Sequence, residues 1–348
     1  MESPAGYLPV LAGVRLMSEG APRDDLPRRP NRPKRVAIAC QGGGSHTAFT
    51  AGVLGTLLEG FPDEYELVGV SGTSGGAACA LLGWYGWVHP DHSPRELLLD
   101  FWTEIAGSTP MHRAVNTLVQ VDVGLRQLGV PLPDVSPAYF PGSWWAQREL
   151  RRSIDRLVSF DRIPDLLDGS EPALLVSAID VVDGRFVIFR EDEVTSDAIL
   201  ASAAEPHLFP AVEVEGRHYW DGLFSKNPPM KDFLTETDIP DPDELWIIMI
   251  NPQEREGVPR SIEEIDNRRN ELSGNLSLNA EVRFIETVNT WIEQGYLPEQ
   301  FTYTEIRRLR FPRRHRLDWR SKLDRDPDFL AELIREGKAV ASAFLTEA

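Results

Sequence analysis

The sequence predicts an α/β fold in which a mostly parallel central sheet lies between helices, as a three-layer α/β/α arrangement. Two strand–turn–helix units follow one another: a strand over 35–40 with a helix over 47–59, and a strand over 66–71 with a helix over 77–85. Successive units of this kind connect parallel strands and place their helices on the faces of the sheet.

The same reasoning predicts the remaining elements. Further strands are expected over 173–179, 185–190, 218–220, 244–251 and 301–311. Helices are expected over 196–204, 262–293 and 328–345. The pair Asp183-Gly184 is typical of a tight turn, so the first two of these strands should form a hairpin.

The chain is expected to divide into three parts. Residues 1–34 carry six prolines among polar and charged residues, which predicts an irregular N-terminal arm. Residues 35–311 hold the strand–helix pattern of the main domain, and the tryptophan- and proline-rich stretch 86–165 within it is expected to be a less regular insertion or a cap. Residues 312–348 are expected to form a C-terminal helical extension.

Composition limits the classes of function. The formal net charge of −18 argues against a nucleic-acid binder and against simple electrostatic docking on an anionic bilayer, so any peripheral contact with a membrane would be local. The longest apolar runs, such as 245–250, are of strand length, far below the roughly 20 residues of a membrane-spanning helix. No basic leader precedes the apolar patch at 7–14, and we therefore expect a cytoplasmic protein.

No metal or cofactor is expected. Cys40 and Cys79 are too few for a disulfide scaffold or a structural zinc site, and each lies in an apolar stretch where a buried free thiol is the usual state. The histidine spacings match no zinc site, and the acidic segments do not follow the pattern of a calcium-binding loop.

The segment Gly72-Thr73-Ser74-Gly75-Gly76 follows an apolar strand directly and precedes a helix, and it has the G-x-S-x-G form of a nucleophile elbow. So sharp a reversal nearly brings together the residues two before and two after the serine, and Gly72 and Gly76 meet that requirement. The dipole of the following helix favours negative charge on the oxygen of Ser74. The alternative is a glycine-rich turn without chemistry, which the strand and helix context disfavours.

A second glycine-rich loop, Gly42-Gly43-Gly44-Ser45, also lies between a strand and a helix. Its N–H groups can converge on an anion, either a phosphate or the oxyanion of an acyl-transfer intermediate. A dinucleotide site would need glycine or alanine where this chain has Thr47, and the Gly-Lys-Ser/Thr of a P-loop is missing from the sequence. The oxyanion hole is the better interpretation, and one donor in such a hole contributes roughly 3 kcal/mol of transition-state stabilisation.

A nucleophilic serine needs a base, and Asp221 is the best-placed candidate. It ends a predicted strand and precedes Gly222, a geometry that can direct its carboxylate to the sheet edge that carries Ser74. The alternative is an ordinary Asp-Gly turn. The histidines are expected to be structural or on the surface, including His218 within a strand and His315 in an arginine-rich run.

Together these motifs resemble the patatin-like phospholipase family: a triple-glycine loop after the first strand, a G-x-S-x-G elbow about thirty residues later and a late Asp-Gly. The resemblance spans about residues 35–310 and includes 201–206, Phe209-Pro210, 216–222 and Asn227-Pro228. Two positions depart from the family pattern. His46 and Thr47 stand where the glycine loop usually continues with a basic residue and a glycine, and Leu223 stands where alanine or glycine usually follows Asp-Gly.

The resemblance implies a lipid acyl hydrolase of the phospholipase A or lysophospholipase type, which cleaves carboxylic esters through an acyl-enzyme. It implies that Ser74 is the nucleophile and Asp221 its only side-chain base, with the oxyanion hole formed by the amides of Gly42, Gly43, Gly44 and Ser45. Two alternatives stay open. One is an esterase or acyltransferase that acts on other esters, and the other is a catalytically silent member of the fold that binds a lipid or a partner.

Two further features each have two interpretations. The tryptophans and leucines of 86–165 suit an acyl-chain pocket or a lipid-facing surface, because indole favours bilayer interfaces, but core packing is the commoner role. A cluster of arginines could bind a phosphate head group, although clustered arginines more often pair with the protein's own carboxylates. The cluster comprises Arg307, Arg308, Arg310, Arg313, Arg314 and Arg316.

Overall fold

A computed structural model describes residues 32–107, 110–127, 133, 135–255, 257–298, 300–312, 317–318 and 320–347. The arm predicted over 1–34 therefore lies almost entirely outside the described residues. Residues 33–348 form one compact unit.

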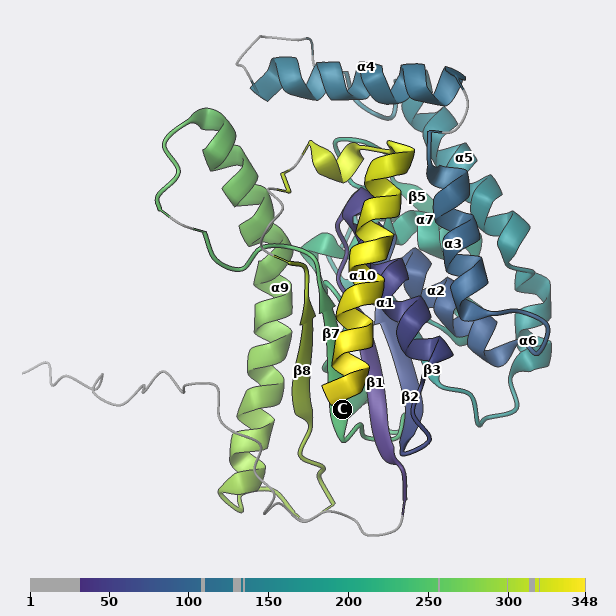
Figure 1. The fold of residues 1–348 in the computed structure, drawn as a ribbon, viewed down its shortest axis with the longest axis vertical. Coiled ribbons are helices and arrows are strands. Elements are labelled where there is room, and N and C mark those ends of the chain that lie inside the picture. Colours follow the sequence, from purple (N-terminus) through teal and green to yellow (C-terminus); the bar gives the residue numbers. More distant parts are fainter. Residues whose placement is uncertain are drawn as a thin grey trace, which may run out of the picture. The chain divides into compact units, whose positions relative to one another are not determined.

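A sheet of eight strands lies at the centre of the unit (Figure 1). Its strands are β1 (Lys34–Cys40), β2 (Tyr65–Gly72), β3 (Ala173–Asp180), β4 (Phe186–Arg190), β5 (Val212–Val214), β6 (Arg217–Asp221), β7 (Glu244–Met249) and β8 (Glu305–Arg310). The order is β5-β6-β3-β2-β1-β7-β8, with β4 paired to β3. The strands β3, β2, β1, β7 and β8 run parallel, whereas β4, β5 and β6 form antiparallel pairs, so the predicted mostly parallel sheet is confirmed.

Helices cover both faces of the sheet. The core on one face is completed by α1 (Thr47–Glu59), α2 (Gly75–Val88), α3 (Pro94–Ile105) and α10 (Pro327–Glu347). The core on the other face is completed by α8 (Asp232–Thr235) and α9 (Ile262–Glu293). The three-layer α/β/α prediction is therefore confirmed.

Strand β1 shows why the sheet is central. Val36 and Ile38 pack in one core and Ala37 and Ala39 in the other, and all four are fully buried. A strand that is apolar on both faces is stable only between two layers of helices.

The insertion over 86–165 is largely helical, so the prediction of a less regular segment is wrong. It contains all of α3 together with α4 (Pro110–Gln127), α5 (Pro141–Leu157) and most of the short α6 (Ile163–Leu166). The helices α3, α4 and α5 each begin at a proline, Pro94, Pro110 and Pro141. Proline is favoured in the first turn of a helix, where its missing N–H is not needed, so these prolines mark helix starts rather than irregular chain.

Helix α10 packs closely along α1. A Cβ at Gly52 of α1 would lie under 3.0 Å from the backbone of Ile334, and a Cβ at Gly337 of α10 would lie equally close to the backbone of Phe49. The C-terminal helix thus contributes to the same compact unit as the sheet, and the division at residue 311 stays a sequence-based prediction.

Two of the three described arginines of the predicted cluster, Arg307 and Arg308 but not the exposed Arg310, form ion pairs with the protein's own carboxylates. Arg307 lies 3.5 Å from Glu244, and Arg308 lies 3.1 Å from Glu286. The interpretation as internal ion pairs therefore holds for these two residues. Arg313, Arg314 and Arg316 lie outside the described residues.

In the described part of the chain, no helix has both the length and the apolar character to span a bilayer. Cys40 and Cys79 are free and buried, as predicted, and burial raises the pKa of both thiols.

Candidate active site

The two glycine-rich loops lie side by side at the carboxyl edge of the sheet. Cys40 at the end of β1 pairs with Gly72 at the end of β2, so the loops that follow the two strands leave the sheet at the same level. A Cβ on Gly42 would lie 3.1 Å from Cβ of Ser74 and under 3.0 Å from the carbonyl oxygen of Thr73. Only a glycine at position 42 allows the first loop to approach the elbow so closely.

The backbone of Ser74 adopts a strained conformation. Its φ is 57° and its ψ is −127°, a left-handed region that residues with a side chain rarely occupy. A Cβ on Gly72 would lie under 3.0 Å from the backbone of Gly76, and a Cβ on Gly76 would come equally close to the carbonyl of Cys40. The two glycines predicted for the elbow therefore occupy positions where no side chain fits.

Strand β6 brings Asp221 to the same edge. It runs antiparallel to β3, with Asp221 opposite Ala178, two residues beyond Val176, which pairs with Gly72. At this position Asp221 lies close enough to Ser74 for the Ser74 hydroxyl group to lower the pKa of the carboxyl group. The structure thus brings the predicted nucleophile and base, 147 positions apart in the chain (221 − 74), to the same edge of the sheet.

Burial changes the acidity of Asp221. Its side chain is only 3% exposed. Burial raises its pKa to about 7, against the opposing effect of a hydrogen bond from the amide of Leu223, at 2.8 Å, and of the Ser74 hydroxyl group. A carboxyl group of this acidity can both accept and release a proton near neutral pH.

The amide groups of the first loop differ in availability. The N–H of Gly42 donates to Oδ1 of Asn227 at 2.7 Å, and Nδ2 of Asn227 donates to the carbonyl of Gly274 at 2.9 Å. Among the hydrogen bonds of the described residues, none uses the amide of Gly43 or Gly44. The amide of Gly42 is therefore already engaged, and it is not free to act as one of the four predicted oxyanion donors.

A buried lysine lies behind the first loop, and the sequence analysis did not predict it. Lys322 is in the short 3-10 helix η5 (Ser321–Leu323), and Nζ of Lys322 donates to Oδ1 of Asn270 at 2.6 Å. A Cβ on Gly44 would lie under 3.0 Å from the carbonyl of Lys322, so η5 packs directly on the loop. The cation lowers the pKa of Asp221, while burial lowers the pKa of Lys322 to about 8.

The family model described as patatin-like phospholipase matches residues 38–234, more than half of the chain. This chain belongs to the patatin-like phospholipase family. The matched region contains both glycine-rich loops and Asp221, whereas Lys322 lies beyond its end.

Two solved structures are similar to this patatin-like chain. VipD from Legionella pneumophila has 12% identity and a TM-score of 0.37, with 87% of this chain and 67% of that chain covered. A chain of the SpcU–ExoU complex from the type III secretion system of Pseudomonas aeruginosa has 18% identity and a TM-score of 0.29, with 72% of this chain covered. This chain spans about half (52%) of the length of the latter. The comparison with curated proteins gave no significant match.

The departures from the patatin-like pattern have structural roles. Thr47 Oγ1 donates to the carbonyl of Gly44 at 2.6 Å. A Cβ on Gly75 would lie under 3.0 Å from Thr47 Oγ1, so Thr47 packs between the glycine loop and the elbow. His46 is buried, and its Nε2 forms a 2.8 Å hydrogen bond with Oγ of Ser321. Burial holds the pKa of His46 well below its usual range, so this histidine is neutral. Both residues fix the loop against its neighbours.

No described histidine has a hydrogen bond to Ser74 or Asp221. His218 is exposed on β6, and His207 is exposed and pairs with Glu205. His315 lies outside the described residues. Within the part of the chain that the structure describes, no group of three or more histidine, cysteine, aspartate or glutamate side chains is arranged to hold a metal ion.

Proposed function

We propose that this chain is a lipid acyl hydrolase of the phospholipase A or lysophospholipase type, with Ser74 as the nucleophile and Asp221 as its only side-chain base. The observation that carries the proposal is that the strained Ser74 and the buried carboxyl group of Asp221 lie at the same edge of the sheet, where Ser74 affects the pKa of Asp221. Membership of the patatin-like family supports a lipid ester as the substrate.

In the first step, Oγ of Ser74 attacks the carbonyl carbon of the ester while its proton passes to Asp221. The carbonyl oxygen becomes an oxyanion that the amides of Gly43 and Gly44 stabilise, at roughly 3 kcal/mol for each well-aligned donor. The intermediate then collapses to an acyl-enzyme on Ser74, and the leaving alcohol takes the proton from Asp221.

In the second step, a water molecule attacks the acyl-enzyme and gives its proton to Asp221. The second tetrahedral intermediate uses the same oxyanion donors. Its collapse releases the fatty acid and returns the proton to Ser74. One carboxyl group thus acts as base and acid in both halves of the reaction, which requires a pKa near the working pH.

The environment of Asp221 suits these roles. An aspartate of ordinary acidity would be a weak acceptor for a serine proton, and burial makes this one more basic. The nearby cation of Lys322 acts in the opposite direction and keeps part of the population ionised at neutral pH.

The proposal is tested by mass analysis of the products from phosphatidylcholine with two different acyl chains and from lysophosphatidylcholine. We expect the full chain to release fatty acid, and Ser74→Ala and Asp221→Asn to reduce the rate at least about a thousandfold. The matched controls are Ser342→Ala and Asp91→Asn, two exposed positions outside the site, which should keep the wild-type rate. Full activity of Asp221→Asn would refute the assignment of the base.

The same assay separates the alternatives. Transfer of the acyl group to an added alcohol would identify an acyltransferase. Cleavage of a soluble p-nitrophenyl ester without cleavage of either phospholipid would identify an esterase for other substrates. Without turnover of any ester, the chain would be a silent member of the family.

A further inference from the structure

We propose that the insertion carries an interfacial docking surface for a zwitterionic phospholipid layer. The surface, called the cap surface below, consists of the exposed apolar residues Leu118, Val121, Leu125, Val135, Tyr139, Phe140, Trp144 and Trp145. This inference rests on the proposed function, since docking on a lipid layer serves a lipid acyl hydrolase, but the docking itself can be measured without catalysis.

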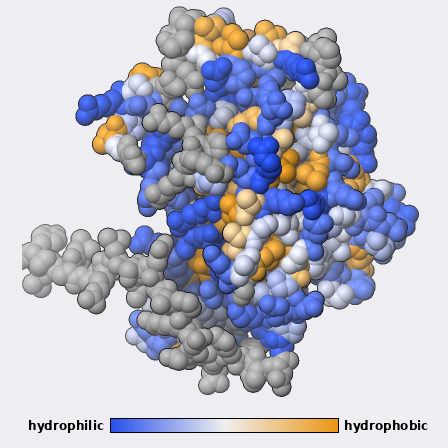
Figure 2. Space-filling model, in the orientation of Figure 1, coloured by the Kyte–Doolittle hydropathy of each residue, from blue (hydrophilic) through white to orange (hydrophobic). Residues whose placement is uncertain are grey.

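The helix α4 contributes an apolar stripe. Leu118, Val121 and Leu125 follow one another at helical spacing, and their exposed fractions are 68%, 49% and 36%. Hydrophobic side chains gather at the top of Figure 2, where Figure 1 draws α4. An amphipathic helix whose apolar side faces outward is typical of proteins that bind at a lipid interface.

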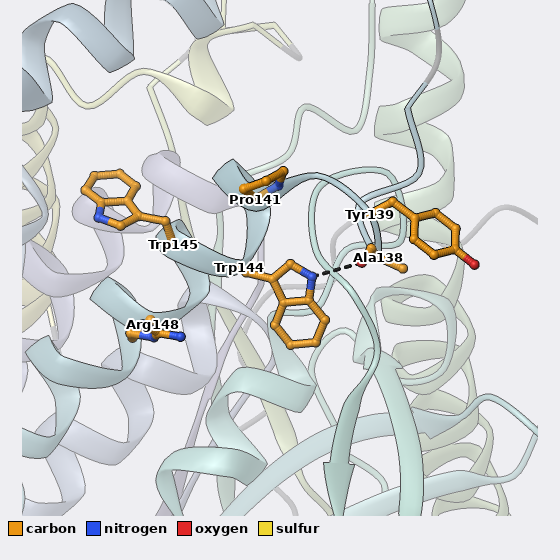
Figure 3. A pocket seen from close by; sticks show the side chains of 6 residues that line it. All are labelled: Ala138, Tyr139, Pro141, Trp144, Trp145 and Arg148. Carbon is orange, nitrogen blue, oxygen red and sulfur yellow. Dashed lines mark hydrogen bonds between the residues drawn. The ribbon is translucent and has the colours of Figure 1, made fainter.

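The start of α5 contributes aromatic side chains. Figure 3 shows Tyr139, Trp144 and Trp145 around the turn before this helix and in its first turn. Tyr139 is 85% exposed, and the indole N–H of Trp144 donates to the carbonyl of Ala138 at 3.0 Å. Tyrosine and tryptophan combine an apolar ring with a polar group, and they concentrate where hydrocarbon meets water.

A cation borders these aromatic rings. Arg148 lines the same pocket as Trp144 and Trp145 and has no ion pair among the described residues. By contrast, the next arginines of α5, Arg151 and Arg152, pair with Asp197 and Glu149. A guanidinium group without an acidic partner, beside exposed indole rings, matches the chemistry of a lipid phosphate.

The cap surface belongs to helices that are attached to the catalytic loops. Nδ2 of Asn116 in α4 donates to Asp324 at 2.9 Å, close to η5, which packs on the glycine loop. Nε2 of Gln147 in α5 donates to the carbonyl of Pro210 at 3.3 Å, in the segment that follows α7 (Ser196–Ser202). A lipid layer that contacts the cap surface would therefore lie on the side of the sheet that carries Ser74.

The charge of the protein selects the class of lipid. A net charge of −18 repels anionic head groups at long range, so the contact must come from apolar burial and from the local cation Arg148. Phosphatidylcholine carries no net charge and presents a phosphate, and it satisfies both conditions.

The test is flotation of the full chain with phosphatidylcholine vesicles. The cap variant is Leu118→Ser with Tyr139→Ser, at positions that are 68% and 85% exposed. The matched control is Leu276→Ser with Tyr296→Ser, at positions in and just beyond α9 that are each 73% exposed. We expect the cap variant to lower the vesicle partition coefficient at least tenfold while the control keeps the wild-type value.

Further measurements separate this proposal from the proposed function. The cap variant should hydrolyse a soluble p-nitrophenyl ester at the wild-type rate and vesicle phospholipid more slowly, and circular dichroism should show a native fold. If wild type hydrolyses no ester, flotation still tests the docking surface. The docking proposal is overturned if wild type does not bind the vesicles or if both variants lose binding equally. It is also overturned if sedimentation shows a dimer that the cap variant dissociates, because the surface would then bind a second copy of the chain.

Discussion

The backbone amide of Ser74 donates a hydrogen bond of 2.9 Å to Oγ of Ser202, the last residue of α7. This bond holds the amide of a residue whose φ is 57°, a conformation that costs about 1–3 kcal/mol in a residue with a side chain. The packing around the elbow must offset this strain. The same conformation directs Oγ of Ser74 towards Asp221.

Relief of this strain should stabilise the protein. We predict that Ser74→Gly raises the free energy of unfolding by about 1 kcal/mol, because glycine occupies left-handed conformations readily. Ser74→Ala keeps a Cβ and should leave the stability nearly unchanged, so the pair separates strain from the loss of the hydroxyl group. Chemical denaturation measures both, and equal stability of the two variants would show that the elbow stores little strain.

The rate of ester hydrolysis should depend on the ionisation of Asp221. Because the base must be deprotonated to accept the proton of Ser74, kcat/KM should rise with pH and level off above about 7. Lys322→Met removes a cation that lowers the pKa of Asp221 and should move this inflection to higher pH, whereas Lys322→Arg keeps the charge and should move it less. The same inflection in wild type and Lys322→Met would contradict the electrostatic role of Lys322.

Asp221 should also make stability depend on pH. Its pKa is higher in the folded protein, about 7, than the usual 3.8, so the folded state binds the proton more tightly. The resulting stabilisation is complete below the unfolded value and is lost as the pH rises through about 7. Asp221→Asn avoids this loss and should gain stability over wild type between pH 4 and pH 8, by no more than about 4 kcal/mol. Parallel stability curves for the two proteins across this range would refute the raised pKa.

The contact between α1 and α10 should tolerate no added side chain. Gly337→Ala would place a Cβ against the backbone of α1 and should destabilise the protein by about 1–3 kcal/mol. Gly124→Ala is the matched control, since it lies within α4 with no atom closer than 3.6 Å to the new Cβ, and it should stabilise the helix by up to roughly 1 kcal/mol. Thermal unfolding of both variants checks the prediction, and equal effects would contradict the close crossing.

Elements governed by local rules were predicted well from the sequence. The structure has helices at the two predicted ranges 47–59 and 262–293, because apolar periodicity and end signals are local properties. The sharp turn at Ser74 was also predictable, since a turn of this kind requires glycines at fixed positions on either side of the serine. The strand Val212–Val214 was not predicted, because three residues carry too little periodicity.

Residues that act through tertiary contacts could not be found in this way. Asn227 accepts a hydrogen bond from the amide of Gly42, 185 positions away, and the sequence marks it only as part of an Asn-Pro pair similar to the family pattern. Lys322 lies in the segment expected to be a helical extension, and the local sequence does not indicate that this lysine is buried near Asp221. Both positions depend on how segments far apart in the chain pack on the glycine loop, which the local pattern does not specify.

The central claim is that Asp221 activates Ser74, and labelling with a fluorophosphonate probe tests it most directly, because only an activated serine reacts. We predict that the probe modifies wild type at Ser74, as located by peptide mass mapping, that Asp221→Asn reacts at least about a hundredfold more slowly, and that Ser74→Ala does not react. Labelling of Asp221→Asn at the wild-type rate, or modification at a serine other than Ser74, would contradict the account.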